Sequence, residues 1–244
     1  MITSNFIRRM NFFQMIGAVI TIYKRTFWPL TVISIINGLL TILALALAFI
    51  PPYVGAIIFI FVPVLYTGPI LVAMSNTVVG KKVLIMESYR SGFSVGLFFK
   101  TALVALPACL LAIIISVATS IEYFYLFFLV FMPSWIFFPM VSYLEKLGFA
   151  KAYSRSNKLA FANFGRNILI ILACLAFSIP FLLLGVALGS VLVGIIIAVP
   201  FVTMLAVSLF VMAYYETRAR RENYNGDALS QELGFAPLDE MMSM

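Results

Sequence analysis

The chain of 244 residues is 64% hydrophobic and only 10% charged, with a formal net charge of +7 and a mean hydropathy of +1.11. Soluble domains carry about 25% charged residues, so this composition excludes a soluble globule and predicts lipid as the solvent. The chain has no histidine, which excludes histidine-dependent catalytic triads and zinc sites that use histidine.

The first 26 residues predict a cytoplasmic segment that lies along the membrane. Between residues 4 and 24, apolar side chains recur at helical spacing. The apolar stripe consists of Phe6, Met10, Phe13, Gly17 and Ile20. Such a stripe predicts an amphipathic helix in the headgroup region of the bilayer.

Six apolar runs follow, each long enough to cross a bilayer. They cover about residues 27–50, 53–79, 98–121, 123–144, 167–188 and 189–215. Breaks at Pro51-Pro52, at Glu122 and around Gly189 pair the runs into hairpins. The hairpins cover about residues 27–79, 98–144 and 167–215. The sequence therefore predicts an all-α, polytopic membrane domain over residues 27–216, in which a cytoplasmic amphipathic segment precedes each hairpin. A short cytoplasmic tail follows over residues 217–244.

All lysines and arginines fall on one side of the predicted spans. Of the 16 basic residues, 15 lie before the first hairpin, between hairpins or after the last one, and Lys100 lies at the end of the third run on the same side; the opposite turns hold Glu122 as their only charged residue. Lys and Arg collect in cytoplasmic loops because crossing an energised, anionic bilayer is unfavourable for them. The pattern predicts a multi-pass protein of the bacterial cytoplasmic (inner) membrane with both termini in the cytoplasm.

The positions of prolines and cysteines suggest internal repetition. Two spans each carry a pair of prolines six residues apart, and the last span carries one. These predicted kink positions are Pro63, Pro69, Pro133, Pro139 and Pro200. A shift of 65 residues also superimposes Cys109 on Cys174, which favours a parallel repeat of residues 81–144 on 145–215. Chance matching in apolar sequence is the alternative, and both cysteines are interpreted as apolar core residues.

A basic stripe precedes the last hairpin. Its members are Lys151, Arg155, Lys158 and Arg166. Helical spacing places them on one broad face of a helix predicted over residues 149–166, where they would contact anionic lipid headgroups or an acidic partner. The alternative is that these charges only set the topology.

Polar residues inside the spans are few. Asn37 and Asn76 are the candidates for an intramembrane polar site, with hydrogen bonding between helices as the alternative. Glu145 and Glu216 end the fourth and sixth spans beside Lys146 and Arg218, which predicts local ion pairs. No acidic or basic residue lies in the middle of a span, which argues against ion-coupled transport.

Two stretches carry a resemblance to a known family. One runs from Glu145-Lys146-Leu147-Gly148 to Arg155-Ser156-Asn157-Lys158-Leu159, and the other is Tyr214-Tyr215-Glu216-Thr217-Arg218 with its continuation to Tyr224. They resemble the membrane domain found in some bacterial glycerophosphoryl diester phosphodiesterases and in stand-alone membrane proteins. The resemblance implies a six-helix bundle. It implies no phosphodiesterase activity here, because the fused enzymes carry catalysis on a separate soluble domain.

These patterns favour a non-catalytic integral membrane protein that acts as a scaffold, accessory or regulatory component of a membrane process. The alternative is an uncoupled carrier or facilitator for a lipid-like or small apolar molecule; an intramembrane enzyme would lack candidate catalytic groups. No cofactor, metal or nucleic acid is expected. The expected partners are membrane lipids, other membrane proteins or further copies of the chain.

Overall fold

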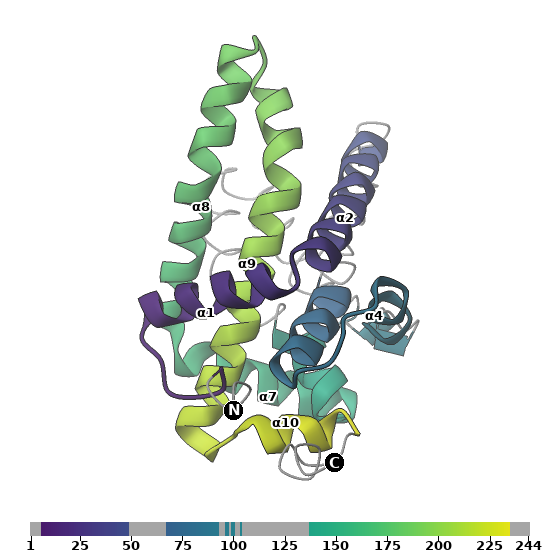
Figure 1. Cartoon of the computed structure of the whole chain (residues 1–244), viewed down its shortest axis with the longest axis vertical. Helices are drawn as coiled ribbons and strands as arrows, with labels where there is room; N and C mark the ends of the chain where they lie inside the picture. The colour runs from purple at the N-terminus through teal and green to yellow at the C-terminus, as the bar shows by residue number, and fades with distance from the viewer. Residues whose placement is uncertain are drawn as a thin grey trace, which may run out of the picture.

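The structure, a computed structural model, describes residues 6–48, 67–92 and 137–234 and five isolated positions between 96 and 103. The described residues contain helices and no strand (Figure 1). The helices are α1 (Phe12–Arg25), α2 (Phe27–Ala48), α4 (Ile85–Gly92), α7 (Phe149–Ala162), α8 (Phe164–Ala187), α9 (Val191–Glu222) and α10 (Gly226–Glu232). Residues 67–78 and 137–144 are also helical.

Helices α8 and α9 are the longest and run antiparallel, side by side (Figure 1). The turn between them contains Gly189, whose φ of +82° lies in the left-handed region that glycine adopts without strain. Close to that turn the backbones approach so tightly at Gly185 and Gly194 that a Cβ on either would overlap the other helix. The break that the sequence indicates around residue 189 is therefore a real helix–helix turn.

Helices α1 and α2 meet at an elbow of 99°. Thr26 forms the joint, because its amide and hydroxyl both donate to the carbonyl of Ile22 in α1 while its carbonyl accepts from the amide of Leu30 in α2. The Tyr23 hydroxyl also lies 2.7 Å from the Thr31 hydroxyl across the bend. Figure 1 shows α1 crossing the α8–α9 pair, whereas α2 runs along the bundle.

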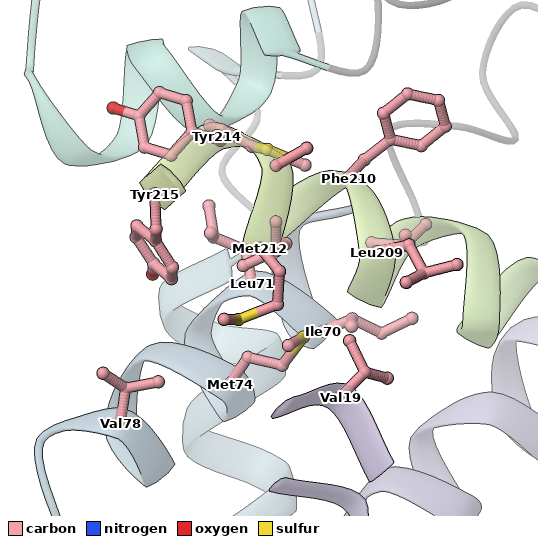
Figure 2. Close-up of a cluster of buried hydrophobic side chains, with 14 of the residues drawn as sticks. Val19, Ile70, Leu71, Met74, Val78, Leu209, Phe210, Met212, Tyr214 and Tyr215 are labelled. Atoms are coloured by element: carbon pink, nitrogen blue, oxygen red, sulfur yellow. The ribbon is translucent and has the colours of Figure 1, made fainter. Parts of the chain in front are cut away.

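The core lies where α1, α9 and the helix over residues 67–78 pack together (Figure 2). Its largest fully buried side chains include aromatic, methionine and aliphatic residues from all three elements. The members of this buried core that Figure 2 labels are Val19, Ile70, Leu71, Met74, Val78, Leu209, Phe210, Met212, Tyr214 and Tyr215. Helix α9 thus supplies the central surface on which earlier segments of the chain pack.

Among the described residues, two helices are long and apolar enough to cross a membrane, namely α8 and the part of α9 from residue 200 to residue 222. A third span results if the bent α1–α2 pair counts as one. The membrane-helix character that the composition predicts is confirmed at this level. The six-span count, the first two hairpins and the 81–144 repeat fall largely on residues outside the described ranges and stay predictions.

Two predicted interfacial helices differ in extent from the observed ones. Helix α1 begins at Phe12 instead of near residue 4, because the Asn11 side chain accepts from the amide of Gln14 and forms a capping box with it. Helix α7 ends at Ala162, and α8 begins two residues later. Arg166 therefore belongs to the first turn of α8 and not to the helix that carries Lys151.

Candidate functional site: an ionic network at one end of the bundle

The polar end of α9 gathers most of the acidic residues that the structure describes. It lies opposite the α8–α9 turn, beside α7 and α10 (Figure 1). Seven ion pairs there join four arginines with four glutamates. The members are Arg155, Arg166, Arg218, Arg220, Glu145, Glu216, Glu222 and Glu232.

Two left-handed residues fold the chain back onto this end. Lys146 (φ 50°) follows the helix over residues 137–144 and precedes α7, and Asn223 (φ 54°) ends α9. Asn225 then caps α10 by accepting from the amide of Ala228 at 2.9 Å. The two turns bring α7 and α10 to the last turns of α9.

Arg218 is the centre of the first group of charges, the Arg218 cluster, which also contains Glu145, Arg155, Glu222 and Glu232. Its guanidinium donates to both carboxylate oxygens of Glu232 at 2.8 and 3.0 Å and to Glu222 at 3.1 Å. The bidentate geometry is the strong form of this contact. The guanidinium also lies 3.7 Å from the centroid of the Tyr224 ring, so aromatic and ionic contacts together hold α10 against α9.

Two tyrosine hydroxyls complete the Arg218 cluster. The Tyr224 hydroxyl donates to Glu232 at 2.6 Å, and the Tyr214 hydroxyl donates to Glu145 at 2.9 Å while accepting from Arg218 at 3.1 Å. Burial and, to a smaller extent, the neighbouring Tyr215 and Glu232 raise the pKa of Tyr224 well above its usual value. Tyr224 therefore stays protonated and acts as a hydrogen-bond donor.

Arg155 connects α7 to the same cluster. Its Nε donates to Glu145 at 3.0 Å and its Nη2 pairs with Glu222. Burial lowers the pKa of Arg155, but the hydrogen bond that it donates to Glu222 and the negative charge of Glu145 outweigh that effect and leave the pKa raised. The guanidinium is therefore permanently charged, and it fixes α7 across the end of α9.

Glu216 forms a second group, the Glu216 cluster, with Arg166 and Arg220. The Glu216 carboxylate is fully buried, pairs with Arg166 from α8 and accepts from Arg220 at 2.6 and 2.9 Å. A buried carboxylate is tolerated only when it is paired and hydrogen-bonded. Glu216 therefore ties the start of α8 to the end of α9, at the open end of their hairpin.

Glu145 and Glu216 both form ion pairs, as predicted, but neither pairs with its expected neighbour. Glu145 pairs with Arg155 and, at 3.9 Å, with Arg218, not with Lys146. Glu216 pairs with Arg220, four positions later in α9, and with Arg166 of α8. Adjacent residues in the sequence do not reveal these partners. Helix geometry and the tertiary fold, and not direct adjacency in the sequence, select the partners.

The predicted basic stripe is divided by the structure. Lys151 and Lys158 are exposed and form no ion pair with any described residue. Arg155 lies at the edge of the buried face of α7, and Arg166 lies on α8; both are committed to the two clusters. The free part of the stripe is thus a pair of lysines seven residues apart, on the outer face of α7.

The candidate intramembrane polar residues lie at separate places. Asn37 is buried, and the Tyr89 hydroxyl of α4 donates to its Oδ1 at 3.0 Å, close to the carbonyl of Ile33 at 3.2 Å. Burial raises the pKa of Tyr89 to about 12, so this donor stays neutral. Asn76 is buried in the helix over residues 67–78. The structure does not bring the two asparagines into one described site.

The predicted kinks can be placed for Pro200, which lies inside α9, where its carbonyl accepts from the Ser34 hydroxyl of α2. Pro69 and Pro139 lie in the helices over residues 67–78 and 137–144. Pro63 and Pro133 fall outside the described residues, so the paired bends stay predictions. Cys174 is a buried free cysteine of α8, and Cys109 is outside the described ranges.

Within the described residues no group of three His, Cys, Asp or Glu side chains is placed to hold a metal ion. No family model, curated protein or solved structure matches this chain. The resemblance to the phosphodiesterase membrane domain therefore stays a prediction. Its two stretches do meet in space, however, because Glu145 and Arg155 from the first contact Tyr214, Arg218 and Glu222 from the second.

The sequence marks the two stretches but does not assign a site to several residues that build the clusters. The overlooked residues are Tyr214, Glu222, Tyr224 and Glu232. The sequence pattern that points to them is the alternation of Tyr, Glu and Arg beyond the apolar part of the last span. Such a composition is unusual for a tail that is only solvated. The pairings themselves require the turns at Lys146 and Asn223, which the sequence does not mark.

Proposed function

We propose that this chain is a non-catalytic integral membrane protein that serves as a scaffold, accessory or regulatory component of a membrane process. We place both termini and the ionic network on the cytoplasmic side of a bacterial inner membrane, as the distribution of Lys and Arg indicates. Its contact surface is the outer face of α7. We also propose that the bundle that carries this face has six spans.

One observation carries the proposal: Arg155 is held between Glu145 and Glu222, which fixes α7 while its other face stays exposed. That face presents Lys151, Ser154, Lys158 and Phe161, which recur at helical spacing and are all exposed. A rigid helix with two lysines and an aromatic side chain suits an acidic protein partner or an anionic bilayer surface. The four arginines of the clusters are neutralised internally, which leaves this face as the distinct basic surface of α7.

Photocrosslinking in native membranes tests the contact surface. A photoreactive residue at position 154 should give a discrete protein adduct, whereas the same group at the exposed Leu175 of α8 should give lipid adducts only. Lys151→Gln with Lys158→Gln should reduce the adduct severalfold. The charge-matched control, Lys24→Gln with Arg221→Gln, changes exposed residues elsewhere and should leave the yield unchanged. Lipid adducts alone at position 154 would contradict a partner-binding role.

A second measurement separates the scaffold from the alternative carrier. The purified chain, reconstituted into vesicles, should leave the rate at which a fluorescent phospholipid crosses the bilayer equal to that of protein-free vesicles. A faster crossing that depends on the protein would favour the carrier and overturn the proposal. Binding at α7 and movement across the bilayer are thus measured independently.

A further inference from the structure

The outer face of helix α1 is exposed, although its inner face packs on the rest of the bundle. The inner face belongs to the buried core through Met15, Val19 and Ile22. On the outer face Phe13 is 80% exposed and Ile20 is 48% exposed, with the exposed Gly17 between them. Phe6 and Met10, which the sequence places on the same stripe, are buried instead. The outward apolar surface therefore begins at Phe13 and belongs to a helix that is fixed to the protein.

The charges and aromatic rings around this face suit a bilayer surface. Helix α1 contains no aspartate or glutamate, and its last turn carries Lys24 and Arg25. At the elbow that follows, Trp28 is 73% exposed and Phe27 is 46% exposed. Aromatic residues beside cations are typical of the membrane interface, where rings contact acyl chains and cations contact phosphates. The chemistry of this face therefore favours lipid as its partner.

The elbow prevents α1 from crossing a bilayer by itself. Its 14 helical residues extend about 21 Å, whereas the hydrocarbon core of a bilayer is about 30 Å thick. The bend of 99° at Thr26 also prevents α1 from continuing α2 in a straight line. Figure 1 shows α2 running along the bundle and α1 crossing the α8–α9 pair. A helix that crosses the bundle in this way lies close to the membrane plane when α8 and α9 span the bilayer.

The exposed side chains of α8 indicate where the bilayer surrounds the bundle. Large apolar residues are exposed on α8 from Ile168 to Leu188, the residue that caps the helix. A helix rises about 1.5 Å per residue, so this band is about 30 Å long and matches the hydrocarbon core. The Arg166–Glu216 pair lies directly beyond Ile168. The charged end of the bundle therefore lies at the polar edge of one leaflet.

Contacts at both ends of α1 place it near that edge. Just before α1, the Arg9 guanidinium donates to the carbonyl of Arg220, in the charged end of α9, at 3.5 Å. Just after α1, the Ser34 hydroxyl of α2 donates to the carbonyl of Pro200, in the apolar part of α9. Helix α1 thus lies between the charged end and the apolar part of the bundle, which is where headgroups meet acyl chains.

We infer that the outer face of α1 is embedded in the cytoplasmic leaflet, at the boundary between headgroups and acyl chains, with Phe13 and Ile20 in contact with the acyl chains. Helix α1 is then an in-plane helix and not the first half of a bent span, so α2 alone continues into the bilayer. The inference goes beyond the contact surface on α7 and takes from the proposed function only the side of the membrane. This contact holds the bundle at a fixed depth and keeps the ionic network beside the headgroups.

Depth-dependent quenching of tryptophan fluorescence tests this position in the full chain, reconstituted into vesicles. The two native tryptophans are removed as Trp28→Phe and Trp135→Phe. Phe13→Trp or Ile20→Trp then serves as the reporter. The quencher is phosphatidylcholine that is brominated either near the headgroup end or near the methyl end of its acyl chains. Both reporters should be quenched about twofold more strongly by the shallow bromine, since an interfacial helix is buried about 5–10 Å into the boundary.

Agreement between the two reporters is the decisive result. They lie about 10 Å apart along the helix, so an in-plane helix gives both the same ratio of shallow to deep quenching, whereas a span gives different ratios. Leu175→Trp, in the exposed band of α8, is the deep control and should show the opposite order. Gln231→Trp, exposed on α10, is the control outside the bilayer and should be quenched by neither lipid.

Two results would overturn the inference. Unequal ratios at positions 13 and 20, with stronger deep quenching at one of them, would show that α1 enters the bilayer as half of a bent span. Absence of quenching at both positions would show that protein, such as a second copy of the chain, covers this face. A thermal midpoint equal to that of wild type in each variant confirms that the reporters leave the fold intact.

Discussion

Helices α8 and α9 are antiparallel neighbours of contrasting character. In the most apolar stretch of α8 only 22% of the residues are buried, whereas in the corresponding stretch of α9 67% are buried. The more apolar helix is thus the more exposed one, because its leucines and phenylalanines face outward, where lipid replaces water as the surrounding medium. Helix α9 instead packs against protein over most of its surface, and it ends in buried charges.

The contrast teaches that apolarity and burial are separate properties in a membrane bundle. In a soluble protein an exposed leucine-rich helix would mark an interaction site, but in a bilayer it requires no partner. A buried glutamate such as Glu216, in contrast, must find its partners within the protein. The specificity of the fold therefore depends more on the polar end of α9 than on the apolar length of α8.

The sharpest test of this contrast compares two leucine-to-alanine substitutions in the neighbouring helices. Leu209 of α9 is 1% exposed, and its replacement should lower the free energy of unfolding by about 2–5 kcal/mol. Leu175 of α8 is 56% exposed, and its replacement should cost no more than about 0.5 kcal/mol. Reversible unfolding in mixed micelles measures both, and equal losses would show that α8 is also packed against protein.

The next largest effect is expected at Glu216. Glu216→Gln removes the buried charge between Arg166 and Arg220 and should cost about 2–3 kcal/mol, below the usual value for a broken buried pair because Arg220 is 46% exposed and can turn to solvent. Glu87→Gln on the exposed surface of α4 is the matched control and should be neutral. Loss of stability that is equal in both variants, measured by the same unfolding assay, would contradict a special role for the Glu216 cluster.

The tight approach of α8 and α9 predicts a smaller loss. A Cβ at residue 194 would lie 2.6 Å from the carbonyl oxygen of Phe181, so Gly194→Ala must separate the helices and should cost about 1–3 kcal/mol. Gly165→Ala, in the first turn of α8, meets no atom within 4 Å and should be neutral or stabilise by up to about 1 kcal/mol. The thermal midpoint in detergent should therefore fall for Gly194→Ala and stay unchanged or rise for Gly165→Ala.

The smallest predicted effect concerns one buried hydrogen bond. The Tyr215 hydroxyl lies 2.6 Å from the Ser75 hydroxyl, and Tyr215→Phe should cost about 1 kcal/mol by leaving the serine without that partner. Tyr153→Phe on the exposed side of α7 is the control, and its thermal midpoint should match the wild-type value. A shift at residue 153 that equals the one at residue 215 would assign the effect to something other than this bond.

Much of the last third of the chain could be anticipated from the sequence. The break around Gly189, the helix before the last hairpin and the apolar spans on either side follow from residue periodicity and from glycine placement. The exact helix ends do not follow from the sequence in this way. The Asn11 cap sets the start of α1, and local packing sets the end of α7 at Ala162. The reach of α9 to Glu222 also exceeds its apolar stretch, since its polar end is stabilised by partners remote in sequence.

The candidate site could be predicted only in part for the same reason. The sequence identified Arg155 and Arg166 as basic and Glu145 and Glu216 as paired, but it could not decide which cation meets which carboxylate. Arg218 lies beside Glu216 in sequence, yet it faces α10 and binds Glu232. Helical geometry points adjacent side chains in different directions, so adjacent charges rarely pair with one another.

The docking of α10 has a consequence for biosynthesis. Glu232, the bidentate partner of Arg218, leaves the ribosome after every other member of its cluster. Until then Arg218 has only Glu222 and the more distant Glu145 as carboxylate partners. A polypeptide interrupted before residue 226 would keep its apolar helices but would lack the contacts between α10 and Arg218. Synthesis of α10 is therefore the step that closes this end of the bundle.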